Sequence, residues 1–225
     1  SSHCMGLTPA PAHPISVLPG SLRKSLQALV DEKELTELRQ VPDDLLNDRQ
    51  LRVKRATLSG KHFFDQAAAA RALQQHKLPA YFMNFETIQF AVPIWKGTRP
   101  YQQVPFQFSV HRLSRSGKLS HNSFLDLSGK NPSMAFAKAL LETCGTQGPV
   151  FAYNASFEVS RIRDLATRFP RHATGLNALA ERVVDLLPVA RDHYYHPAQK
   201  GSWSIKAVLP ALCPGLDYAQ LDGVP

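Results

Sequence analysis

Two carboxylates of this sequence stand among apolar residues, where each could bind a hard cation. Glu86 follows Asn84 by two positions in the apolar, aromatic segment Ala80–Ile88. Because strand side chains alternate between faces, Phe82, Asn84 and Glu86 would share one face. An acid within such a strand is costly to bury without a partner, and oxygen ligands at i and i+2 suit Mg²⁺. For Glu86 alone, the favoured explanation is an acid at a strand end that caps the next turn through Thr87.

The second carboxylate, Glu158, follows the short apolar segment that ends at Tyr153. On a helical wheel of about 100° per residue, it lies in an apolar stripe with Val159, Ile162, Leu165, Ala166 and Phe169. The wheel therefore predicts a carboxylate that points toward the core, one turn into a helix. The helix dipole favours an anion in that turn, which is a purely structural alternative.

Two carboxylates of this kind are part of what two-metal phosphoryl transfer needs. The metals lie about 4 Å apart, and a carboxylate usually bridges them. In the first strand the natural bridging position is Asn84. A neutral amide can donate one carbonyl oxygen, but it brings no charge and bridges poorly.

The segments around these residues resemble the motifs of the DnaQ-like (DEDD, ribonuclease H-fold) 3′→5′ exonucleases. The sequence Asn84-Phe-Glu86 is similar to the first motif, Asp-x-Glu. The sequence Asn154-x-x-Phe157-Glu158 is similar to the second, usually Asn-x-x-Phe-Asp. Residues 182–191 and 201–206 are similar to the strand and helix that precede the third motif.

Residues from about 13 to 225 more closely resemble an uncharacterised bacterial family of that superfamily, whose members often lie C-terminal to a RecB-like nuclease region. The stretches 97–103, 105–111, 194–197 and 201–212 carry this resemblance. It implies a metal-dependent 3′→5′ exonuclease that acts on single-stranded DNA or RNA. It also implies Mg²⁺ or Mn²⁺ held by three residues of the first two motifs, Asn84, Glu86 and Glu158. Asp185 and Asn154 would support that site.

The chain departs from the family pattern in two places. The first is Asn84, which stands where the family has Asp. The second concerns the third motif, a Tyr or His shortly before an Asp: it would follow Asp222 and Gly223, and the sequence stops at Pro225. We therefore expect little or no nuclease activity from this chain. The alternatives are a non-catalytic module that binds nucleic acid or protein, and a domain that positions a RecB-like nuclease region in the same polypeptide.

The formal net charge of +8 favours a polyanionic partner. The residues that could contact nucleic acid are Arg99, Tyr101, His196, Lys200 and Lys206. Local packing of the aromatic residues and simple solvation of the cations are the alternatives. Cys4, Cys144 and Cys213 are few and far apart, which argues against disulfides and zinc and favours a cytoplasmic location. We find no apolar run of about 18 residues that would span a membrane and no signal peptide.

The elements that must position these residues follow from periodicity and from turn residues. We predict an α/β domain with a ribonuclease H-like mixed sheet flanked by helices, after a small N-terminal helical region. The expected divisions are an extended leader over 1–20, helices over 21–78, and the exonuclease-type domain over 79–225 without its C-terminal motif. Strands are predicted at 80–88, 104–113, 119–127, 150–153 and 182–187, and helices at 132–144, 154–169 and 205–212.

Overall fold

The computed structural model describes residues 10–215 of the chain. They form two compact units. Unit 2 is the continuous segment 70–189, and unit 1 combines the described residues 10–69 and 190–215. The expected boundary at residue 79 therefore lies inside unit 2. The end of the expected second domain packs with the N-terminal helices.

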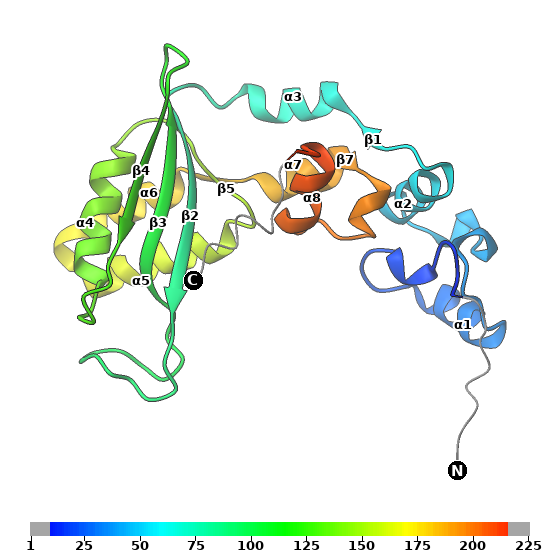
Figure 1. The fold of residues 1–225 in the computed structure, drawn as a ribbon, viewed down its shortest axis with the longest axis horizontal. Helices are drawn as coiled ribbons and strands as arrows, with labels where there is room; N and C mark the ends of the chain where they lie inside the picture. Colours follow the sequence, from blue (N-terminus) through cyan, green and yellow to red (C-terminus); the bar gives the residue numbers. More distant parts are fainter. Residues whose placement is uncertain (1–9, 216–225) are drawn as a thin grey trace. The chain divides into compact units, whose positions relative to one another are not determined.

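Unit 2 is built on a five-stranded mixed sheet (Figure 1). In the order β4-β3-β2-β5-β6, the first three strands are antiparallel neighbours, whereas β5 and β6 run parallel to β2. This confirms the predicted α/β class and is consistent with a ribonuclease H-like fold. The strands are β2 Ala80–Ile88, β3 Val104–Leu113, β4 Leu119–Leu125, β5 Val150–Ala152 and β6 Val183–Asp185.

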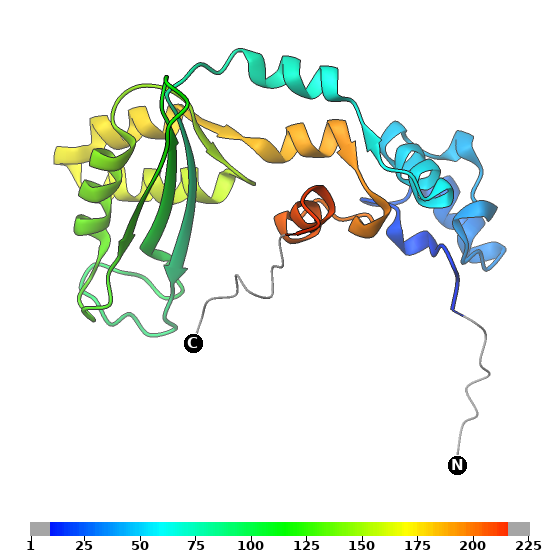
Figure 2. The ribbon, with the colours of Figure 1, turned by 45° about the horizontal axis from the view of Figure 1, so that its top comes forward.

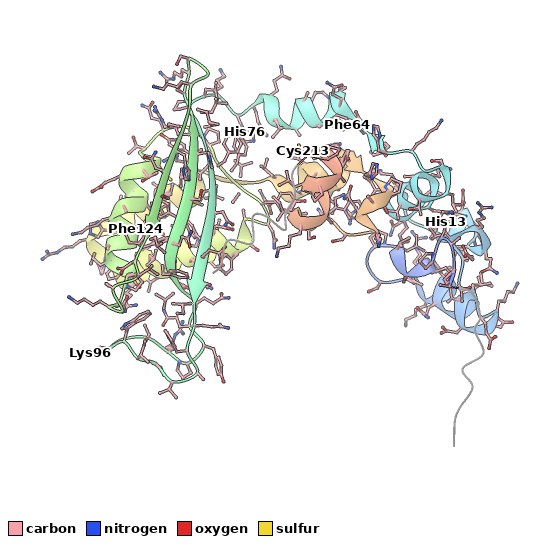
Figure 3. The ribbon with its side chains drawn as sticks, in the orientation of Figure 1. His13, Phe64, His76, Lys96, Phe124 and Cys213 are labelled. Atoms are coloured by element: carbon pink, nitrogen blue, oxygen red, sulfur yellow. The ribbon has the colours of Figure 1, made fainter. Side chains whose placement is uncertain are left out.

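Three helices cover one face of this sheet, as Figures 1 and 2 both show. They are α4 Ser133–Cys144, α5 Ser156–Arg168 and α6 Ala173–Glu181. The core between the layers includes Phe136 of α4, whose ring meets Phe108 at 5.3 Å and Phe124 at 5.7 Å between centroids. Phe124 is labelled in Figure 3. Helix α6 was not among the predicted helices, because Pro170 and Gly175 interrupt the helical pattern there.

Strand β2 is buried on one face only. Tyr81, Met83 and Phe85 are buried, whereas Phe82, Asn84 and Glu86 are exposed. The predicted alternation is confirmed. The idea that Glu86 sits in a buried environment is wrong, because its face of the strand is open to solvent.

Unit 1 gathers helices around a second core of its own. Leu26, Leu38 and Val41 are buried there together with Ile15 and Leu18. Residues 15–18 were expected in an extended leader, but Ile15–Val17 forms a 3-10 helix instead. The elements of unit 1 are α1 Lys24–Glu32, α2 Asp48–Ser59, β1 Phe63–Phe64, β7 Tyr194–Tyr195 and α8 Ile205–Leu212, while α3 Gln66–Gln74 and α7 Leu186–His193 cross the boundary to unit 2.

Helix ends in unit 1 follow local capping chemistry. Asn47 caps α2, because its side-chain Oδ1 accepts from the Gln50 backbone amide at 2.9 Å. Gly60 ends α2 in a left-handed conformation with φ +69°. The Asp65 carboxylate accepts from the Ala68 amide at 2.9 Å and so caps α3.

The cysteines within residues 10–215 are free thiols. Burial raises the pKa of Cys144 to about 12, although the nearby Arg182 acts in the opposite direction. Its thiol is therefore protonated and unreactive near neutral pH. Cys213 is exposed, and Cys4 lies outside the described residues.

Candidate metal and nucleic-acid site

Asn84 and Glu86 project from the exposed face of β2. In the antiparallel ladder with β3, Asn84 lies opposite Ser109, and Glu86 lies opposite Gln107. The register shifts between Glu86 and Thr87, so Glu86 is the last residue before an irregularity in the strand. Such irregularities re-aim a side chain. The strand thus presents both oxygen-bearing side chains at the point where regular pairing ends.

Aromatic rings lie beside these two residues on the same open face. Phe82 is 39% exposed and stacks on Phe151 of β5 with centroids 5.4 Å apart. His111 and His121 face each other across the β3–β4 hairpin and stack at 4.4 Å. The two histidines therefore pack against each other across the hairpin. Phe151 was not singled out in the sequence, because a phenylalanine in a short apolar strand normally indicates core.

Glu158 is buried in the first turn of α5. Ile162 and Leu165 of the same helix pack in the core with Met83 of β2, so the predicted core-facing stripe is confirmed. The Oε2 atom of Glu158 is buried without a hydrogen-bond partner among the described residues. Burial raises the pKa of this carboxyl, a hydrogen bond from its own backbone amide opposes that effect, and the charge of Asp185 adds to it.

Asp185 holds the turn that leads into α5. Its Oδ1 atom accepts from the backbone amides of Asn154 and Leu187, each at 2.9 Å. Asn154 has φ +62°, a left-handed conformation that asparagine tolerates better than most residues. Asp185 thereby fixes Asn154 and, through it, the start of the helix that carries Glu158.

The strand topology relates the two groups of residues. Strands β2, β5 and β6 are parallel, so their carboxyl ends lie at the same edge of the sheet. The structure brings Glu158, Asn154 and Asp185 together at the ends of β5 and β6. Asn84 and Glu86 lie on the neighbouring strand, on the face opposite the helices. Within residues 10–215, no three His, Cys, Asp or Glu side chains gather into a group that could hold a metal ion.

A divalent cation fits this arrangement in part. A buried carboxylate oxygen without a partner is costly, and a cation would compensate it. Oδ1 of Asp185 already accepts two amides, which suits a supporting role. Asn84 offers one neutral oxygen where a bridging charge is needed. The residues therefore suit one cation at Glu158 better than a complete two-metal centre. The third motif expected after Gly223 lies outside the described residues.

The predicted nucleic-acid contacts fall in both units. Arg99 and the 67% exposed Tyr101 lie in the loop after β2 in unit 2. In unit 1, the Nδ1 atom of His196 accepts from the Ala198 amide at 3.1 Å and caps a short 3-10 helix. Lys200 and Lys206 are exposed side chains of unit 1.

The aromatic residues next to His196 have a structural role. Tyr194 and Tyr195 are buried. The indole of Trp203 donates to the Tyr194 carbonyl at 2.9 Å, and the Tyr195 hydroxyl accepts from the Gly201 amide at 3.1 Å. Both tyrosines therefore serve local packing, and they cannot stack on bases while they are buried.

Fold and site together define an α/β domain with a buried acid at the start of a helix, beside an open strand that carries an amide and a second acid. The model of the family described as "Domain of unknown function (DUF2779)" matches residues 81–204, just over half of the chain. The chain belongs to this family. Neither a curated protein nor a solved structure matches the chain. Among the described helices, none combines the length and the apolar character needed to cross a membrane.

Proposed function

We propose that this chain is an exonuclease-like domain of the DnaQ-like, DEDD superfamily, built for metal-dependent 3′→5′ hydrolysis of nucleic acid. The observation that carries the proposal is a buried carboxylate oxygen of Glu158 at the start of α5, which has no hydrogen-bond partner within residues 10–215. Folding such a group without a cation is unfavourable, and perturbed acids of this kind concentrate at functional sites. Catalysis is impaired here, because Asn84 replaces the acid that would bridge two metals.

In this proposal Mg²⁺ or Mn²⁺ would be held chiefly by Glu158, with Glu86 and Asn84 of the nearby strand β2 as the other ligands that the motifs assign. When bound, the cation would supply positive charge to the phosphodiester and lower the pKa of a water molecule. Asp185 and Asn154 keep the start of α5 in place. The exposed ring of Phe82, next to Asn84 on the same face, offers a surface on which a base could stack.

The substrate class in this proposal is single-stranded DNA or RNA, supported by the formal charge of +8. A RecB-like nuclease region in the same polypeptide and a cytoplasmic location belong to the same proposal.

Restoring the bridging acid tests the proposal. Asn84→Asp should bind Mn²⁺ more tightly than the parent chain in calorimetry. It should also degrade labelled single-stranded DNA about 10²–10³ times faster, the usual effect of one electrostatic stabiliser. Asn84→Asp combined with Glu158→Gln is the matched control and should lose both gains. An Asn84→Asp chain that neither binds Mn²⁺ nor degrades the oligonucleotide would contradict the metal-site assignment.

A non-catalytic nucleic-acid or protein-binding module is the second candidate. It is favoured by the absence of a three-acid group within residues 10–215 and by the neutral Asn84. Salt-sensitive binding to single-stranded DNA, with no degradation by either the parent chain or Asn84→Asp in Mn²⁺, would support this candidate over the enzyme.

A further inference from the structure

A basic groove lies on unit 1, and its lining includes none of the site residues Asn84, Glu86 and Glu158. Helix α2 carries arginines at every third position, so Arg49, Arg52 and Arg55 are neighbours on its surface. The chain turns at Gly60 and adds Lys61 and His62. The groove has a volume of about 430 Å³ and is lined by Asp48, Leu51, Arg52, Arg55, Ala56, Ser59, Lys61, His62 and Phe63. We name it the α2–β1 groove.

Arg52 is held in a fixed orientation in this groove. Its guanidinium lies over the Phe63 ring, 4.3 Å from the centroid. Its Nη1 atom donates to the backbone carbonyls of Asp192 at 2.7 Å and Arg191 at 3.3 Å. No carboxylate within residues 10–215 forms an ion pair with Arg52. An ordered guanidinium with uncompensated charge loses little entropy when an anion binds it.

The other cations of the groove are open to a ligand. Arg55 reaches Asp43 at 3.7 Å, but the two side chains are 70% and 51% exposed, so this ion pair is weak. Lys61 is exposed. Against Arg52, Arg55 and Lys61, the lining contains one acid, Asp48, which leaves a net charge of +2.

The groove also has an apolar component. Leu51, Ala56 and the Phe63 ring lie among the cations. Cationic side chains beside an apolar and aromatic surface match a single strand of nucleic acid, whose phosphates alternate with sugars and bases. An acidic peptide would match the charge but leave the apolar surface without a regular counterpart.

We propose that the α2–β1 groove binds the phosphodiester backbone of single-stranded nucleic acid. This inference takes its ligand class from the proposed function, but it uses none of the site residues Asn84, Glu86 or Glu158. It gives unit 1 a role in holding the strand independently of the chemistry in unit 2.

The test measures fluorescence anisotropy of a labelled oligothymidylate of about 20 nucleotides, longer than a typical single-strand site. EDTA is present to prevent cleavage. The groove variant is Arg52→Gln/Arg55→Gln/Lys61→Gln. The matched control is Arg23→Gln/Lys24→Gln/Lys33→Gln, which removes the same charge from exposed positions of unit 1 outside the groove.

We expect the groove variant to lose at least about tenfold in affinity at low salt. The plot of log association constant against log salt concentration should become shallower by about 2, because each of the three lost phosphate contacts contributes roughly 0.7. The control should stay close to the parent chain. Because Arg52 also holds the backbone of residues 191 and 192, Arg55→Gln/Lys61→Gln provides a variant with Arg52 intact. It should lower the slope by about 1.4.

Three outcomes would overturn the inference. Equal losses in the groove and control variants would show that only net charge matters. An unchanged affinity in the groove variant would remove the groove from binding. Displacement of the oligonucleotide from the groove by polyglutamate at lower concentration than by unlabelled oligothymidylate would identify an acidic protein segment as the ligand.

The same variants separate this inference from the proposed function. Groove-dependent binding together with no cleavage by Asn84→Asp would contradict the exonuclease proposal alone. Cleavage by Asn84→Asp with groove-independent binding would contradict the groove alone.

Discussion

Glu86 and Glu158 have the same side chain but different surroundings. Glu86 is exposed on an open strand face, so water solvates its charge. Glu158 is buried at the start of α5, and one of its oxygens has no partner within the described part of the chain. The cost of leaving a charge unsolvated falls on Glu158 alone. At the scale of single residues, Glu158 is the group whose chemistry needs a ligand.

Replacing Glu158 by glutamine should change the pH dependence of stability. Burial raises the pKa of Glu158 above its ordinary value of 4.5, so the folded state holds its proton more tightly than the unfolded chain. Its contribution to stability is full below the unfolded pKa and is lost as the pH rises through the folded pKa. Glu158→Gln should therefore have a higher Tm than the parent at neutral pH in EDTA, and a similar Tm at pH 4.5 or below.

Thermal melts monitored by circular dichroism, with EDTA or Mn²⁺, check this prediction. About 1 kcal/mol shifts the Tm of a chain of this size by roughly 2–4 °C. Mn²⁺ should stabilise the parent but not Glu158→Gln, and the exposed Glu86→Gln should behave as the parent does in EDTA. A lower Tm for Glu158→Gln at neutral pH would show that the carboxylate is satisfied in the fold.

For single residues, the sequence predicted the direction of a side chain better than its exposure to solvent. The wheel placed Glu158 toward the core, and strand parity placed Asn84 and Glu86 on one face; both are confirmed. The exposure of Glu86 could not be predicted, because an apolar strand with one open face and a fully buried strand share much of their composition. Catalytic and ligand roles stay predictions.

At the scale of elements, two short connections determine where Glu158 lies. The turn after β5 requires a left-handed residue at Asn154, and the end of β6 supplies the acceptor that holds it. The same oxygen accepts from Leu187 at the start of α7. One carboxylate oxygen thus ties a loop and a helix start to the end of β6.

Asp185→Asn and Asp185→Ala separate the acceptor from the charge. Asp185→Asn keeps an Oδ1 acceptor, whereas Asp185→Ala leaves two amides without their partner and should cost about 1–3 kcal/mol. Urea denaturation of both variants measures the difference. Mn²⁺ affinity, measured in the Asn84→Asp background, should fall in Asp185→Ala because Glu158 is less well positioned. Equal stability of the two variants would contradict this role.

Gly201 joins the two chain segments of unit 1 by close approach. It has φ +78°, and a Cβ there would lie 1.9 Å from the backbone oxygen of Val17. Gly20 has a similar φ of +71°, but a Cβ there would meet no atom within 4 Å, so Gly20→Ala isolates the backbone strain. We expect about 1–2 kcal/mol of destabilisation for Gly20→Ala and clearly more for Gly201→Ala, measured by urea denaturation. Equal losses would mean that residues 17 and 201 do not meet in solution.

Long elements were predicted well because their periodicity is set locally. Strands Ala80–Ile88 and Val104–Leu113 and helix Ile205–Leu212 have the predicted bounds. The two-residue strands β1 and β7 were not predicted, because they exist through pairing between Phe63–Phe64 and Tyr194–Tyr195, about 130 residues apart in sequence. Helix periodicity likewise could not show that Ile15 and Leu18 belong to a core.

At the scale of the whole molecule, unit 2 is an insertion into unit 1. The chain leaves unit 1 near residue 69 and returns near residue 190. Each unit has its own hydrophobic core. The two segments of unit 1 contact each other through the β1–β7 pair and through the close approach of Gly201 to Val17.

Separate expression of the segments tests this organisation. Residues 70–189 should fold alone with cooperative thermal unfolding and dispersed amide resonances, because the sheet and its covering helices are complete within that segment. Residues 10–69 alone should be less stable than in the intact chain, since they keep their hydrophobic core but lack the β7 pairing and the second segment. A disordered 70–189 fragment would show that the units are not independent.

The β1–β7 pair also determines how the chain would respond to mechanical tension. Phe63 pairs with Tyr195, and Phe64 pairs with Tyr194, in antiparallel register at the two ends of the insertion. Force applied at residues 10 and 215 would pass across this pair and would not load the five-stranded sheet. The force would act on Phe63 and Tyr195, which are paired at the same end of the antiparallel pair. The hydrogen bonds would therefore open one after another, starting from that end. Unit 1 would then extend first, and the sheet that carries Asn84 and Glu86 would stay folded until the pair had opened.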